Sequence, residues 1–80
     1  MNPTIRANVR RPSDGNRLFT VKEHMKICQI IKKLYPNGLV VDSAHAERGF
    51  VESVAATVPF FLNISPDDLY VYFEALGYAV

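Results

Sequence analysis

The segment from Thr20 to Gly38 constrains the fold more than any other part of this sequence, because it contains a helix start, a helical repeat and a helix stop in succession. Thr20 and Glu23 have the spacing of a capping box, in which each side chain binds the backbone N–H of the other residue. Apolar residues then recur every three or four positions until Pro36 ends the pattern. The sequence therefore predicts an amphipathic helix over Val21–Tyr35.

The two faces of this predicted helix differ in chemistry. The apolar face consists of Val21, Met25, Cys28, Ile31 and Tyr35, widened by Ile27, Ile30 and Leu34. The opposite face consists of Lys22, Lys26, Gln29 and Lys33. Because Cys28 falls within the apolar face, we expect it to pack in the core as a small apolar side chain. We expect His24 at the edge of the helix.

Further elements are predicted on the C-terminal side of this helix. Ser65 is a helix cap, Pro66 suits a first turn, and the two aspartates that follow suit the positive end of the helix dipole, so a helix is expected over Pro66–Leu76. Three-and-four spacing predicts another helix from Asp42 or Ser43 to Thr57. Leu39–Val41 is expected to be a short buried strand. The segment 60–64 is either a strand or an apolar linker.

The N-terminal segment has the pattern of a hairpin. Residues Thr4–Arg10 alternate between apolar and polar, which is typical of a half-buried strand, and the Pro-Ser-Asp-Gly sequence at 12–15 is strong turn chemistry. Residues 1–17 are therefore expected to form a hairpin or, alternatively, a flexible basic arm. The chain as a whole is predicted to be one small α+β domain over residues 1–80, with about three helices and a two- to three-stranded sheet. The alternative is a three-helix domain with a flexible arm.

Charge is distributed unevenly along the chain. Residues 1–36 carry eight basic and two acidic side chains, a net charge of +6, whereas residues 37–80 carry one basic and six acidic side chains, a net charge of −5. The predicted basic surface comprises Arg6, Arg10, Arg11, Arg17, Lys22, Lys26 and Lys33. Arginine clusters bind phosphate as well as carboxylate, so nucleic acid is one candidate partner.

The C-terminal third contains more apolar side chains than the face of one helix can bury. Of the 27 residues from Val54 to Val80, 18 are apolar. Tyr70, Val71 and Tyr78 are left over once the predicted face of the last helix is filled. Tyrosines beside aliphatic side chains are typical of interface hot spots, so these three residues are predicted to bind a protein partner or a second copy of the chain. The alternative is a larger core that absorbs them.

Motifs for catalysis, cofactors and metals are absent from the sequence. It contains no phosphate-binding loop, H-E-x-x-H, C-x-x-C or G-x-S-x-G motif. His24 and Cys28 lie four residues apart on one helix, but zinc needs three or four converging ligands. Asp67 and Asp68 are explained by helix capping. We therefore expect no enzyme activity, cofactor, metal or small-molecule substrate.

These observations favour a small binding protein. The chain has a single cysteine, no visible targeting signal and no apolar segment long enough to cross a membrane, so a cytoplasmic, non-membrane protein is expected. The predicted function is non-catalytic binding, with regulation or inhibition of another macromolecule, first of all a protein. Small accessory proteins of phages and mobile elements commonly act in this way. Nucleic-acid binding by the N-terminal arginines is the second hypothesis.

Overall fold

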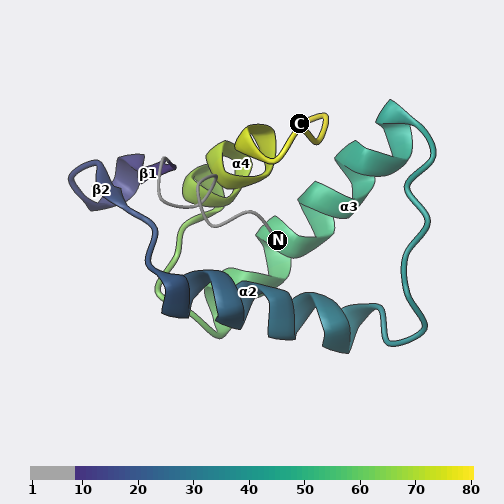
Figure 1. Cartoon of the computed structure of the whole chain (residues 1–80), viewed down its shortest axis with the longest axis horizontal. Helices are drawn as coiled ribbons and strands as arrows, with labels where there is room; N and C mark the ends of the chain where they lie inside the picture. The colour runs from purple at the N-terminus through teal and green to yellow at the C-terminus, as the bar shows by residue number, and fades with distance from the viewer. Residues whose placement is uncertain (1–8) are drawn as a thin grey trace.

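The computed structural model describes residues 9–80, which form three α-helices and a short N-terminal hairpin (Figure 1). The helices are α2 (Val21–Leu34), α3 (Ala44–Thr57) and α4 (Pro66–Ala75). Strand β1 (Arg10–Arg11) pairs with strand β2 (Arg17–Leu18) in antiparallel fashion. Figure 1 shows α2 along one side of the molecule, α3 and α4 on the other, and the hairpin at the end nearest the start of α2. The predicted α+β class is confirmed.

The hairpin turns through the 3-10 helix η1 (Pro12–Asp14) and two residues with positive φ. Gly15 has φ 62° and Asn16 has φ 59°, a backbone region that glycine and asparagine enter at low cost. Beyond the paired strands, the N–H of Phe19 donates to the carbonyl of Val9 at 3.0 Å, and both side chains are buried. Residues 9–19 thus form the predicted hairpin, while residues 4–8 of the predicted first strand lie outside the described residues.

The three helices begin at the residues that the sequence indicates. Thr20 Oγ1 accepts from the N–H of Glu23 at 3.1 Å, and Glu23 Oε1 accepts from the N–H of Thr20 at 2.9 Å, so the capping box is present. Ser43 caps α3 by accepting from the N–H of Ala46 at 3.1 Å. Ser65 caps α4 in the same way. These local signals are independent of tertiary packing, and all three predictions are confirmed.

The buried face of α2 is rotated relative to the prediction. Ile27 and His24 are its buried residues, whereas Val21 and Met25 are exposed and Cys28 is only half-buried. The physical reason is that the hydroxyl of Tyr72 on α4 forms a hydrogen bond with Nδ1 of His24, which turns that side of α2 inward. Cys28 therefore lies at the border of the core and not within it as expected, and the expectation of an edge position for His24 was wrong.

Aromatic rings dominate the core between α3 and α4. Phe73 packs edge-on against Phe50, with ring centroids 5.5 Å apart, and against Tyr72, with centroids 5.2 Å apart. Such T-shaped contacts add to the stabilisation from buried area. The buried hydrophobic residues are Val9, Phe19, Ile27, Phe50, Val51, Val54, Ala55, Val58, Ile64, Leu69, Tyr72 and Phe73.

Two apolar segments for which the sequence predicts or allows a strand, residues 39–41 and 60–64, do not form one in the structure. Residues 39–41 are irregular, and the side chain of Val40 is 82% exposed, so the predicted strand there was wrong. A β-branched run forms a strand only against a partner, and the described sheet consists of the hairpin alone. The segment from 58 onward forms the 3-10 helix η2 (Val58–Phe60) and a turn, in which the N–H groups of Phe61 and Leu62 both donate to the carbonyl of Val58 at 2.9 Å.

Candidate functional site

The structure divides the predicted basic surface into paired arginines and unpaired lysines. Arg6 lies outside the described residues. Arg17 forms ion pairs with Asp14 at 2.5 Å and with Glu23 at 2.7 Å, so its charge is locally neutralised. Arg10 is exposed and donates to the carbonyl of Asn16 at 3.0 Å. Lys22, Lys26 and Lys33 are exposed on α2, and none of them forms an ion pair within residues 9–80.

Arg11 belongs to the interior, which corrects its predicted place on the surface. It is 3% exposed, and its guanidinium donates to Asp68 Oδ2 at 2.8 Å, to Glu23 Oε2 at 2.5 Å and to the carbonyl of Asn63 at 2.7 Å. Asp68 is fully buried and accepts from the hydroxyl of Ser13 at 2.6 Å as well. Buried charges require this degree of pairing, so both residues are structural. Helix capping alone was therefore the wrong explanation for Asp68.

Acid should weaken this cluster of charges. Hydrogen bonds from Arg17, together with those from the Thr20 backbone and the charge of Arg11, lower the pKa of Glu23 from 4.5 to about 2. Burial opposes ionisation of Asp68, but hydrogen bonds from Ser13 and Arg11 hold its pKa below the usual value. A carboxylate whose pKa is lowered by folding stabilises the fold when ionised, so its contribution is complete above about pH 4.5 and is lost as the pH falls toward 2.

The free energy of unfolding, measured by urea titration, is therefore expected to decrease as the pH falls from 4.5 to 2. The contribution of Glu23 to this decrease is about 1 kcal/mol, because the carboxylate is partly exposed and solvent screens the pair. Glu23→Gln should make the decrease smaller. Glu52→Gln is the control, since Glu52 forms no ion pair with any described residue, and it should retain the full decrease. An unchanged acid dependence in Glu23→Gln would contradict this assignment.

The predicted partner surface is partly absorbed by the core. The ring of Tyr78 contacts those of Phe50 and Phe73, with centroids 5.4 and 5.7 Å away, and Tyr70 packs half-buried against the same core. The expectation that Tyr70 and Tyr78 are left outside the core was therefore wrong, because side chains of α2, α3 and α4 together form a core that both tyrosines contact. Val71 is 37% exposed and remains on the surface. A binding role for these residues stays a prediction.

His24 and Cys28 form a structural contact with α4. Nε2 of His24 lies 3.6 Å from Sγ of Cys28, while Nδ1 of the same ring bonds the hydroxyl of Tyr72. Within the described part of the chain, no three His, Cys, Asp or Glu residues come together in an arrangement that could hold a metal ion. Both ring nitrogens of His24 are therefore engaged within the fold.

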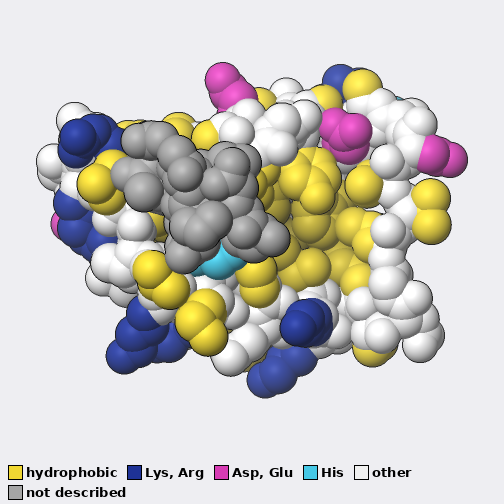
Figure 2. Space-filling model, in the orientation of Figure 1, with side chains coloured by type: hydrophobic (Ala, Val, Ile, Leu, Met, Phe, Trp, Pro, Cys, Tyr) yellow, Lys and Arg dark blue, Asp and Glu magenta, His cyan; other side chains and the backbone are white. Residues whose placement is uncertain are grey.

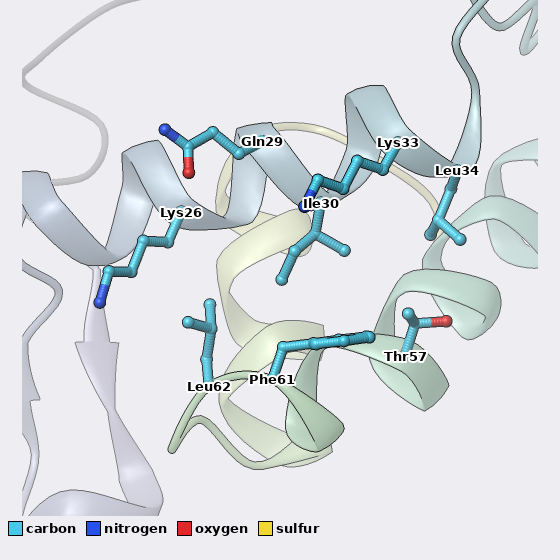
Figure 3. A pocket seen from close by; sticks show the side chains of 8 residues that line it. All are labelled: Lys26, Gln29, Ile30, Lys33, Leu34, Thr57, Phe61 and Leu62. Carbon is cyan, nitrogen blue, oxygen red and sulfur yellow. The ribbon is translucent and has the colours of Figure 1, made fainter.

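A groove of about 380 Å³ opens between α2 and the turn that follows α3 (Figure 3). In Figure 3, Ile30 and Leu34 point from α2 toward the ring of Phe61 on the opposite wall. The groove, which we call the α2–η2 groove, is lined by Lys26, Gln29, Ile30, Lys33, Leu34, Thr57, Phe61 and Leu62. Its volume is in the range of concave binding sites in proteins.

Local sequence explains how the groove forms. Ile30 and Leu34 are four residues apart, so they lie on the same side of α2. Pro59 stands in η2, and the turn that follows directs Phe61 back across α2. The side chain of Phe61 is 71% exposed, and that of the neighbouring Phe60 is 86% exposed. The sequence predicts a strand or an apolar linker here, and phenylalanines are usually buried, so the exposure of Phe60 and Phe61 could not be predicted from the sequence.

The groove is suited to bind an apolar group that has negative charges on either side of it. Two lysines and no carboxylate are present among its described lining residues. The lining also lacks histidine and cysteine, so it offers no acid–base pair or thiol nucleophile.

A second apolar hollow, of about 270 Å³, lies on the other side of α2. Figure 2 shows apolar side chains gathered above α2, next to the connection at residues 35–43. Tyr78 lines this hollow together with Ile31, Val41 and residues of α3 and α4. One residue of the predicted partner surface therefore borders a concave apolar area.

Comparison with known proteins identifies no relative: no protein family, curated protein or solved structure matches this chain. None of the helices formed by residues 9–80 is both long enough and apolar enough to span a bilayer.

Proposed function

We propose that this protein is non-catalytic and acts by binding another protein, with the α2–η2 groove as its docking site. The observation that carries the proposal is the exposure of Phe61 beside a concave apolar floor. Folded proteins seldom leave large aromatic side chains in water next to a cavity unless a partner covers them. Regulation or inhibition of the bound protein is the role proposed for such a module. The lone half-buried cysteine supports a reducing, cytoplasmic compartment.

Charge pairing favours a protein partner over nucleic acid. Arg11 is buried and Arg17 is paired with two carboxylates, so two of the predicted phosphate contacts are already engaged. Among the described residues, the second candidate, nucleic acid, is supported by the unpaired lysines of α2 and by the exposed Arg10. Binding to random-sequence DNA that falls steeply with salt and is lost in Lys26→Gln/Lys33→Gln would favour this second candidate.

Affinity capture from the organism of origin tests the protein-binding proposal. Phe61→Ser is expected to reduce the captured partner at least about tenfold, because a central aromatic contact typically contributes 2 kcal/mol or more to binding. The fold should be retained, since substitutions of exposed side chains usually change stability by less than about 0.5 kcal/mol.

Val40→Ser is the matched control, because Val40 is also apolar and largely exposed but does not line the groove. It should capture the partner as the unmodified chain does. Equal capture by Phe61→Ser would contradict the proposed docking site. Selective loss in Tyr70→Ala would instead assign binding to the outer face of α4.

A further inference from the structure

We infer that helix α4 of a second copy of this chain occupies the α2–η2 groove, so that the protein self-associates through two different surfaces. The inference rests on the proposed function, because it uses the same groove. The two surfaces are the groove itself and the exposed outer face of α4, which carry complementary patterns of charged and apolar side chains.

The first surface presents an apolar centre between two positive charges. Lys26, Ile30 and Lys33 are spaced four and then three residues apart, so they lie on one side of α2, and all three line the groove. Neither lysine forms an ion pair with any of residues 9–80. Their charges are therefore available to a partner.

The second surface presents an apolar centre between two negative charges. Asp67, Val71 and Glu74 have the same spacing of four and then three residues along α4, and all three side chains are exposed. Among the described residues, neither carboxylate takes part in an ion pair, in contrast to the buried Asp68. This face is therefore an acidic amphipathic surface with Val71 at its centre.

The two patterns match in register when the helices run parallel. Lys26 then lies opposite Asp67, Ile30 opposite Val71, and Lys33 opposite Glu74. Each triplet spans about 10 Å of helix, so all three pairs are in reach of each other at once. The remaining apolar wall, formed by Phe61 and Leu62, then covers Val71.

The groove cannot bind a peptide as an added β-strand. An added strand needs unpaired backbone groups at a sheet edge, but one wall of this groove is the side-chain surface of α2, whose backbone is paired within the helix. The exposed charges without an ion pair in residues 9–80 are positive on this side of α2 and negative on the outer face of α4, which supports the same head-to-tail contact.

Sedimentation of the full chain over a range of concentrations, at low and high salt, tests the inference. The unmodified chain should self-associate, and the association should weaken about tenfold or more at high salt because the charge pairs are screened. Lys26→Glu/Lys33→Glu and Asp67→Lys/Glu74→Lys should each sediment as monomers. An equimolar mixture of the two variants should associate again, because each groove then faces an α4 of opposite charge.

Arg48→Glu/Glu52→Lys is the control for charge reversal as such, since both positions are exposed on α3 and neither lines the groove. It should associate as the unmodified chain does, and circular dichroism should show all variants folded.

A strictly monomeric unmodified chain, or a mixture that stays monomeric, would overturn the inference. If Phe61-dependent capture of another protein persists in that case, the proposed function stands and only the identity of the occupant is wrong. Association of the monomeric chain with anionic lipid vesicles, lost in Lys26→Glu/Lys33→Glu, would also overturn it.

Discussion

Asp68→Ala is expected to lower the free energy of unfolding by about 3 kcal/mol, because it removes the fully buried one of the two carboxylates that pair with the buried guanidinium of Arg11. Asp68 is 0% exposed and accepts from Arg11, from the hydroxyl of Ser13 and from the Ser13 backbone. A chain of this size has a total stability of about 5–10 kcal/mol, so this loss is a large fraction of the total. Urea titration followed by circular dichroism measures the change.

Asp67→Ala is the matched control, since Asp67 lies in the same first turn of α4 but is exposed. It should cost about 0.3–1 kcal/mol through the helix dipole alone. Arg11→Met/Asp68→Leu should recover part of the loss, because it removes both charges together. Equal effects of Asp67→Ala and Asp68→Ala would show that the buried pair contributes little to stability.

Phe73→Ala is expected to destabilise the protein by about 3–5 kcal/mol, through lost burial and the cavity left behind. Phe73 is buried and contacts the rings of Phe50, Tyr72 and Tyr78, so no single neighbour can move to fill the space. Thermal unfolding and urea titration report the change. Phe60→Ala removes the same atoms from an exposed site and should change stability by less than about 0.5 kcal/mol. If Phe73→Ala and Phe60→Ala lowered the stability by similar amounts, Phe73 would not be a central residue of the core.

Helix starts could be predicted from the sequence because their signals are local. Thr20, Ser43 and Ser65 each bind a backbone N–H three residues away, so neighbouring residues are sufficient to recognise the cap. The pairing of Arg11 with Asp68 spans 57 residues and exists only in the folded chain. A carboxylate that suits a helix start gives no sign of also holding a buried arginine, which is why Asp68 was explained by capping alone.

The candidate site was only partly accessible to sequence reasoning. The apolar surplus of the C-terminal third was recognised, but it was assigned to Tyr70, Val71 and Tyr78. Tyr78 instead packs between Phe50 and Phe73, whereas the surplus is exposed at Phe60 and Phe61. A count of apolar residues shows how many apolar side chains the segment has beyond those that one helix face can bury. It does not determine which side chains the core accepts, because that depends on how three helices cross.

The distance along the chain between Arg11 and Asp68 affects how the protein is made in a cell. At a synthesis rate of about 5–20 residues per second, Arg11 leaves the ribosome roughly 3–11 s before Asp68. An isolated two-stranded hairpin is marginally stable in water, so residues 9–19 gain little from pairing during this interval. The hairpin therefore cannot make its contact with Asp68 until α4 has been synthesised, so the first element of the described residues depends on the last one.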